Sequence, residues 1–213
     1  MNAEQTLQQA YNLKAKLSTN DCVELNSIIE YLKKEIFEKT LPSHSEKKTY
    51  AATQKLLKKM SKDPRKILGY TKKYEIDGKT YQAFTDTYQA YFLNKTYEQL
   101  PDADTDGKGL GSYPDLTRIF PQCNPRFGHT KLNKKEVSDF VKSVDKNTLE
   151  DKNIVPYSFT MDNGYKAYVN AKFLLTAFDI LGDTLDVYGK SGTWMIEFSS
   201  DIGCGIICQI RHY

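Results

Sequence analysis

The sequence lacks any long apolar segment. Its longest apolar runs, at residues 173–178 and 202–207, are far shorter than the roughly 18 residues that a membrane-crossing helix requires. Its first residues also lack a basic region followed by an apolar block and a small-residue cleavage site, so no secretory signal is indicated. We therefore expect a cytoplasmic protein with no membrane partner.

Cysteine and histidine are scarce, with four and three residues among 213. Thiols are normally kept reduced in a chain without an export signal, so we expect no disulfide. Cys204, Cys208 and His212 are spaced four residues apart, which on a strand would place all three on one face. Zinc sites usually draw on close ligand pairs from a turn, which this segment lacks. Buried apolar thiols are therefore favoured over a metal site, and we expect no metal or cofactor.

Catalytic signatures are also missing. The sequence contains no Gly-x-Ser-x-Gly motif, no Cys–His pattern and no phosphate-binding loop. The stretch Asp102-x-Asp104-x-Asp106-Gly107 is similar to the start of a calcium loop, but the twelfth position, a bidentate Glu in such loops, is Tyr113. Nothing here supports an enzyme. A metal-dependent nuclease assembled from scattered carboxylates stays open as the enzymatic alternative.

What the sequence does contain is an ordinary globular composition with an uneven charge. At 39% hydrophobic and 27% charged residues, 213 residues suffice for one large or two small domains with a core. The net charge is +7 over residues 1–73 and −4 over residues 74–213, and most of the positive excess lies between Glu46 and Lys73. This excess favours a surface that faces a polyanion, although a solvated helix face gives the same pattern.

Hydrophobic periodicity indicates an α+β fold, with helices packed on antiparallel sheets after an N-terminal helical hairpin. Apolar spacings of three and four predict helices over residues 4–17, 21–38, 49–62, 134–144 and 171–181. Short apolar and Tyr-rich runs predict strands over residues 72–76, 80–84, 88–93, 155–161, 164–169, 184–188, 193–198 and 205–211. The break at Leu41–Ser45 and the Asp- and Gly-rich loop at 96–112 divide the chain into a helical extension (1–43), a partial α+β unit (44–112) and a last α+β unit (113–213).

Two segments carry more specific information. Tyr113–Pro121 reads Tyr-Pro-Asp-Leu-Thr-Arg-Ile-Phe-Pro, and Val169–Phe178 reads Val-Asn-Ala-Lys-Phe-Leu-Leu-Thr-Ala-Phe. Together they resemble the bacterial DNA sliding clamp, the β subunit of DNA polymerase III. In that family Phe-Pro-Asp-Tyr-x-Arg-Val-x-Pro leads into the last domain, and Phe-Asn-Ala-Arg-Tyr-Leu-Leu-Asp-Ala-Leu opens its second helix.

Two weaker matches occur in the expected order. Phe84–Gln89, which reads Phe-Thr-Asp-Thr-Tyr-Gln, is similar to the family's Ala-Thr-Asp-Gly-His-Arg, and Ile207–Arg211 lies where clamps finish with Val-Met-Pro-Met-Arg-Leu. The resemblance covers residues 113–213 and, more loosely, residues 45–112. It implies a truncated or divergent relative with a sliding-clamp-like fold.

The resemblance implies a binding role without chemistry, since clamps encircle duplex DNA and tether a polymerase. Such DNA contact is electrostatic and independent of base sequence. The candidate phosphate contacts are the basic residues of the helix expected at 49–62, of the segment after it and of the second helix of the last unit: Lys55, Lys58, Lys59, Lys62, Arg65, Lys66 and Lys172.

Clamps also hold partner peptides in an apolar pocket beside the last strand. Carried over to this sequence, that pocket would include Cys208, Ile210 and Arg211, with Tyr168 or Val169 nearby. Small apolar side chains with one Arg suit a short peptide that has a hydrophobic anchor.

Two functional hypotheses follow. The first is a processivity factor or clamp paralogue in DNA replication, of a kind carried on a mobile element, that binds duplex DNA non-specifically, binds polymerase or other replication proteins, and forms a homo-oligomer. The alternative is a clamp-fold interaction module or regulator that binds replication proteins without encircling DNA. A ring must be an oligomer, and its DNA binding must fall steeply with salt.

Overall fold

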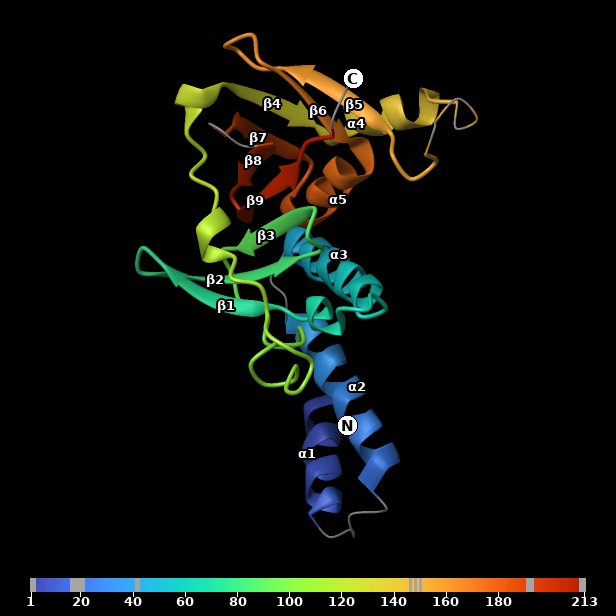
Figure 1. Cartoon of the computed structure of the whole chain (residues 1–213). Helices are drawn as coiled ribbons and strands as arrows, with labels where there is room; N and C mark the ends of the chain where they lie inside the picture. The colour runs from blue at the N-terminus through green and yellow to red at the C-terminus, as the bar shows by residue number, and fades with distance from the viewer. Residues whose placement is uncertain are drawn as a thin grey trace. The chain divides into compact units, whose positions relative to one another are not determined.

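The computed structural model describes residues 3–15, 22–40, 43–145, 147, 149, 151–190 and 194–210 (Figure 1). The chain divides into two units, residues 1–47 and 48–213. None of the helices that the structure describes is long and apolar enough to cross a membrane.

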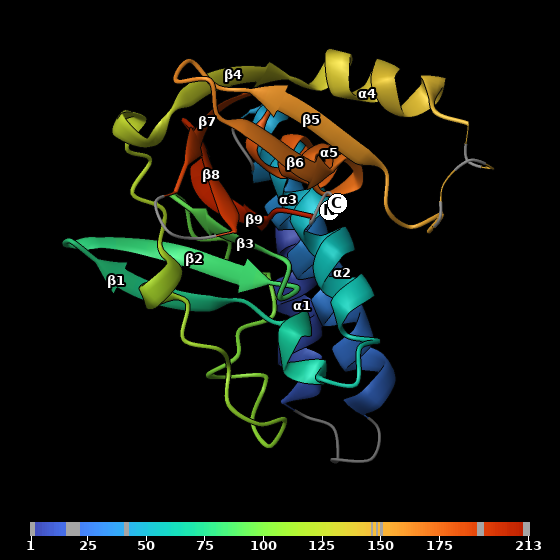
Figure 2. The ribbon, with the colours of Figure 1, turned by 45° about the horizontal axis from the view of Figure 1, so that its top comes forward.

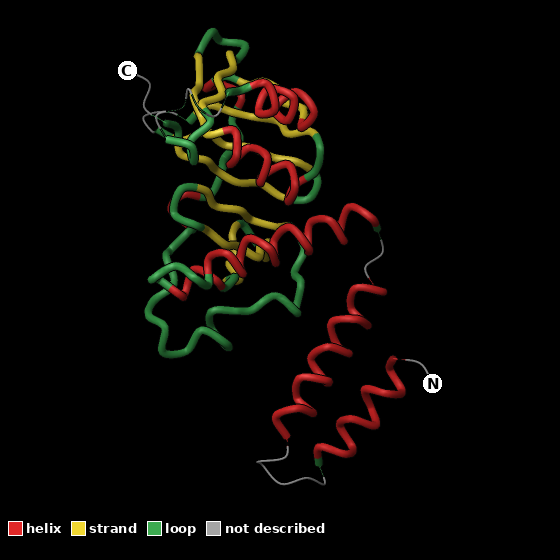
Figure 3. Tube along the Cα trace, turned by 90° about the vertical axis from the view of Figure 1, so that its right-hand side faces the viewer, coloured by secondary structure: helices red, strands yellow, loops and turns green. Residues whose placement is uncertain are grey.

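The first unit is a helical hairpin of α1 (Ala3–Lys14) and α2 (Cys22–Thr40), which run side by side in Figure 3. Leu7 and Ala10 of α1 pack with Leu25 and Ile29 of α2. These are positions at the helical spacing seen in the sequence, so the predicted hairpin is confirmed.

The second unit is built on a seven-stranded antiparallel sheet with the order β1-β2-β3-β9-β8-β7-β4. Its strands are β1 (Lys72–Ile76), β2 (Lys79–Thr85), β3 (Gln89–Leu93), β4 (His129–Asn133), β7 (Thr184–Gly189), β8 (Met195–Ser200) and β9 (Gly203–Cys208). Strands β5 (Pro156–Thr160) and β6 (Lys166–Asn170) form a separate pair. The helices are α3 (His44–Met60), α4 (Lys134–Ser143) and α5 (Ala171–Leu181). Figures 1 and 2 show α3 and α5 on one side of the large sheet. The α+β prediction is confirmed.

Both faces of the large sheet are buried at β3, whose five residues are all buried and whose successive side chains point to opposite faces. Toward α5, Phe84 stacks on Tyr91 at 5.2 Å, and Tyr91 contacts Phe198 at 5.9 Å. On the opposite face, Phe92 packs edge-on against Phe120 at 5.0 Å, within a cluster that includes Leu116. The segment matched to the clamp family at 113–121 therefore covers the side of the sheet away from the helices.

The pairing of β3 with β9 makes the sheet continuous between segments far apart in the sequence, with Gln89 opposite Ile207 and Leu93 opposite Gly203. Strands from the expected 44–112 and 113–213 units thus share one sheet. The division of the chain at 43 and at 112 stays a prediction.

Several element bounds differ from the prediction by a few residues, and one strand was not predicted. Helix α3 begins at His44 rather than Thr49, because Ser43 and Glu46 form a capping box: the Glu46 N–H donates to Ser43 Oγ at 3.2 Å, and the Ser43 N–H donates to Glu46 Oε2 at 3.1 Å. No strand was predicted over residues 129–133, which form strand β4 at an edge of the sheet. Strand β9 ends at Cys208, whereas the prediction continued to Arg211, which lies outside the described residues.

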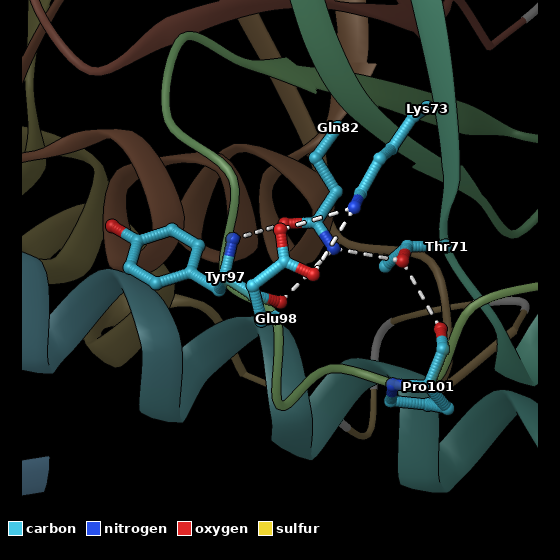
Figure 4. Close-up of polar contacts among 6 residues, drawn as sticks. All are labelled: Thr71, Lys73, Gln82, Tyr97, Glu98 and Pro101. Carbon is cyan, nitrogen blue, oxygen red and sulfur yellow. Dashed lines mark hydrogen bonds and ion pairs between the residues drawn. The ribbon is translucent and has the colours of Figure 1, made fainter. Parts of the chain in front are cut away.

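The loop after β3 is fixed by a buried amide (Figure 4). The side chain of Gln82 donates to Thr71 Oγ1 at 2.9 Å and to the Tyr97 carbonyl at 3.2 Å, and it accepts from the Tyr97 N–H at 2.7 Å. An ion pair of 3.1 Å joins Lys73 to Glu98 on the surface. The Gln82 amide thus provides hydrogen-bond partners for the N–H and carbonyl of Tyr97, a buried residue outside the strands.

Candidate functional site: a groove between α3 and α5

A groove of about 930 Å³ opens between α3 and α5 of the second unit. Its other walls are the β2–β3 turn, the segment before β5 and the residues that follow β9. The lining residues are Ala52, Lys55, Leu56, Lys59, Tyr88, Gln89, Asn153, Ile154, Asn170, Lys172, Phe173, Thr176, Asp179, Cys208, Gln209 and Ile210. The groove therefore collects side chains from five separate segments.

Basic residues line both sides of the groove. Lys55 and Lys59 are exposed on α3, and Lys172 is exposed in the first turn of α5. The Lys172 ammonium donates to the carbonyl of Lys152 at 2.8 Å, which fixes its position on the α5 side. The lining includes one carboxylate, Asp179, and that carboxylate is paired with an outside ammonium, Lys134, at 2.7 Å. The groove therefore has a positive balance.

The rest of the lining is largely apolar. The ring of Tyr88, 61% exposed, stacks on Phe173 at a centroid distance of 6.0 Å and an interplanar angle of 20°. Leu56, Cys208 and Ile210 add aliphatic and thiol surface. Burial, and secondarily the charge of nearby Asp86, raises the pKa of the Cys208 thiol, so this side chain is neutral near pH 7. A ligand with an apolar anchor would find a matching surface here.

The exposed position of Tyr88 is set by the buried carboxylate of Asp86. This carboxylate accepts hydrogen bonds from the Tyr88 N–H at 3.0 Å and from the Gln89 N–H at 2.9 Å, and it accepts from the Gln89 side-chain amide at 2.7 Å. Gln89 in turn accepts from the buried Tyr91 hydroxyl at 2.6 Å. Thr87, at a φ of 77°, makes the tight turn. The Tyr88 carbonyl also accepts from the Cys208 N–H at 2.8 Å, which ties the turn to the end of β9.

The opposite wall depends on Asn170, the N-cap of α5. Its Oδ1 accepts from the Lys172 N–H and from the Val155 N–H, both at 3.2 Å. Its amide donates to the carbonyl of Asn153 at 3.1 Å. One side chain therefore starts the helix that carries Lys172 and fixes the segment that places Ile154 in the groove.

The predicted DNA-contacting residues are distributed as follows. Lys55, Lys58, Lys59 and Lys62, which we call the basic stripe, are exposed and lie at helical spacings of three and four, so they share one face of α3 and the turn after it. Of these, Lys55 and Lys59 line the groove. The exposed residues Arg65 and Lys66 lie beyond the helix, and Arg65 is paired with Asp63 at 3.1 Å.

The predicted peptide pocket is only partly assembled. Cys208 and Ile210 line the groove. Val169 is fully buried in β6 and does not line the groove. Tyr168 pairs through its carbonyl with the Ile210 N–H at 3.0 Å but does not line the groove, and Arg211 lies outside the described residues.

The prediction missed the aromatic part of the groove. Tyr88 and Phe173 both fall within segments matched to the clamp family, yet neither was given a binding role. Their stacking joins residues 85 positions apart, which no local pattern indicates.

The acidic loop at 102–106 satisfies its own backbone. Asp102 accepts from the Asp104 N–H at 2.9 Å, Asp106 accepts from the Asp102 N–H at 2.9 Å, and Asp104 pairs with Lys72 at 2.9 Å. Within the part of the chain that the structure describes, no cluster of three or more His, Cys, Asp or Glu residues could hold a metal ion. Cys123, Cys204 and Cys208 are free thiols.

Comparison with known proteins places the fold. No family model matches the sequence, and no curated protein matches it. Among solved structures, the DNA polymerase III β subunit of Borrelia burgdorferi is similar with a TM-score of 0.51 and 9% identity, over 78% of this chain and 63% of that one. The β sliding clamp of Caulobacter crescentus (TM-score 0.47, 12% identity, 75% and 64%) and that of Bartonella birtlesii (0.47, 11%, 71% and 60%) are also similar. The chain thus spans less than two thirds of the length of these clamps, and its fold is sliding-clamp-like.

Proposed function

We propose that the protein is a tethering factor of the sliding-clamp type, which holds duplex DNA without sequence preference and binds a polymerase or other replication proteins. The clamp-like fold supports this class of function, and clamps act without catalysing a reaction. The observation that carries the proposal is the basic stripe, which extends along one exposed face of α3.

The stripe suits phosphate contact. Its four ammonium groups follow one helix face, and Lys172 adds a fifth charge across the groove. Neutralising about four phosphates gives a log–log salt slope of roughly −3 to −4, which weakens binding about 100-fold between 50 and 200 mM salt. Non-specific tethering needs this dependence and no contact with base edges.

The test compares two charge-matched variants by fluorescence anisotropy with a labelled 30-base-pair duplex. The first replaces the basic stripe by Glu: Lys55→Glu, Lys58→Glu, Lys59→Glu and Lys62→Glu. The control makes the same charge change at exposed positions outside the groove: Lys79→Glu, Lys108→Glu, Lys142→Glu and Lys166→Glu. We expect the stripe variant to show no detectable binding to the duplex, and the affinity of the control for the duplex to fall about threefold or less. Equal losses would refute the assignment of the stripe.

The alternative function is an interaction module that does not encircle DNA, and the largely apolar, partly aromatic lining of the groove supports it. If the unmodified protein does not bind duplex DNA but does bind a replication protein, this alternative is the correct one.

A further inference from the structure

The N-terminal hairpin leaves an apolar surface exposed. Leu13 of α1 is 51% exposed, and Ile28 and Tyr31 of α2 are 51% and 66% exposed. We call these three residues the open face. The basic stripe and the groove both belong to the second unit, so neither accounts for this face.

The open face lies on one side of the hairpin. The other side carries Tyr11 and Lys33, whose ammonium lies 5.8 Å from the centre of the Tyr11 ring. Residues two positions apart on a helix point about 200° apart, so Leu13 points away from Tyr11, and Tyr31 likewise points away from Lys33. Ile28 shares a face with Tyr31, three positions later. Because the two helices run side by side in opposite directions (Figure 3), the three residues form one apolar surface.

The core of the hairpin is small. The buried apolar side chains that the structure describes in residues 1–47 are those of Ala10, Leu25, Ile29 and Leu32. Units of about 40 residues usually need a disulfide, a metal or oligomerisation in addition to such a core. The sequence of this unit has a single cysteine, Cys22, and the described part of the chain has no metal-binding cluster. Of these three sources of stability, oligomerisation remains.

We propose that the open face is a dimerisation surface, on which the hairpin of a second copy of this chain packs to form a four-helix bundle. In this bundle α1 of one copy lies against α2 of the other, in the same antiparallel sense as within one hairpin. A two-fold axis parallel to the helices produces this arrangement, and each copy then contributes the same surface. The proposal does not depend on the proposed function of the second unit.

Charge and occupancy both favour a second copy as the partner. Residues 5–13 of α1 carry no charge, so α1 offers a nucleic acid or another highly charged partner no ion pair there. On α2, Glu35 lies four positions after Tyr31 and is already paired with Lys39. Packing α1 on α2 of the second copy therefore brings no like charges together. A surface that a small unit needs for its stability must be covered whenever the unit is folded, and a second copy is present wherever the protein is.

The test measures the mass of the full chain by light scattering over a range of protein concentrations. The variant Ile28→Asp with Tyr31→Asp puts charges into the interface from both copies, and it should raise the dimer dissociation constant about 100-fold or more. The control, Asn12→Asp with Asn26→Asp, makes the same charge change at exposed positions on other faces of the two helices and should leave the dimer intact. An unmodified protein that is monomeric at every concentration, or an oligomer that the first variant leaves unchanged, would overturn the proposal.

Disulfide trapping tests the arrangement of the helices, and it applies even if the charged variant does not fold. Leu13→Cys and Ile28→Cys are made in separate chains, which are mixed and oxidised by air with copper as the catalyst. Peptide mapping by mass spectrometry should find a disulfide between the two new cysteines, which lie on neighbouring helices of different copies. The mixture of Asn12→Cys and Asn26→Cys should give about a tenth of this product or less. Equal yields from the two mixtures would show that the open faces do not meet, and the proposal would be wrong.

Hydrogen exchange of the unmodified protein separates this dimer from an oligomer formed by the second unit. If a second copy stabilises the hairpin, amide protection of residues 3–14 and 22–40 should fall as the protein is diluted below the dimer dissociation constant. Protection of β3 and β9 in the second unit should not change with dilution. The opposite pattern, in which only the sheet responds to dilution, would assign the oligomer contact to the second unit and overturn the proposal. Hairpin protection that is independent of concentration in a monomeric protein would also overturn it.

Discussion

Replacing Asp86 by Ala should destabilise the second unit severely, because one buried carboxylate organises the whole β2–β3 turn. Three N–H groups, from the Tyr88 backbone, the Gln89 backbone and the Gln89 side chain, would lose their acceptor. Hydrogen bonds to a charged group contribute about 1.5–3 kcal/mol each, and buried donors left unpaired cost about 1–3 kcal/mol. Because the Tyr88 N–H is only partly buried and such effects are not additive, we expect a loss of about 3–5 kcal/mol in the free energy of unfolding.

The assay is urea unfolding followed by tryptophan fluorescence. The sequence contains a single Trp, Trp194, in the second unit, so the signal reports this unit. Asp86→Asn keeps one acceptor oxygen for the two backbone N–H groups and should lose about 1–2 kcal/mol, because its amide faces the donor of Gln89. A loss below about 1 kcal/mol in Asp86→Ala would show that water or a rearranged turn replaces the carboxylate, and the account of how Tyr88 is presented would then be wrong.

The remaining predictions concern reactivity, a second buried carboxylate and assembly. Iodoacetamide should modify Cys208 more slowly than it modifies free cysteine at pH 8, and the rate should rise with pH. The reason is that the raised pKa of Cys208 keeps its thiol protonated, whereas the thiolate is the reactive form. Peptide mapping by mass spectrometry measures the rate of alkylation. Glu197→Ala should lower the free energy of unfolding in urea by about 3–5 kcal/mol, and Glu197→Gln should lower it less. The reason is that this 2%-exposed carboxylate pairs with Lys190 at 2.8 Å and accepts hydrogen bonds from the N–H groups of Gln122 and Cys123. Equal losses in the two variants would contradict this reasoning. Light scattering over a range of protein concentrations should give the mass of a closed oligomer if the protein encircles DNA, and a persistent monomer would favour the interaction module.

The sequence predicted the bounds of an element correctly where the residues of that element and its immediate neighbours determine them. Helix α5 occupies the predicted residues 171–181, because Asn170 caps its start and Gly182, at a φ of 108°, ends it. Strand β4 was missed since His129–Asn133 buries a single side chain, Leu132, and becomes a strand by pairing with β7. Its strand character is a property of the pair, which the segment alone does not reveal.

The candidate site was less predictable than the fold. The spacing of the basic stripe was readable because one helix carries it. The groove needs Tyr88 beside Phe173 and Cys208 hydrogen-bonded to the β2–β3 turn, and these contacts depend on the pairing of β3 with β9. Val169, which the motif match placed near the expected peptide pocket, is buried in β6, and a motif match alone does not indicate burial.

The central position of β9 has a consequence for how the protein is made. Strands β1, β2 and β3 leave the ribosome early, and the partner of β3 follows more than 100 residues later. During that interval the edge of β3, which is buried on both faces in the finished sheet, is exposed and available to other unpaired strands. Synthesis of the intervening residues at about 5–20 residues per second keeps this edge open for several seconds. A nascent chain of this protein should therefore depend on a holding chaperone until the last strand of the sheet is released.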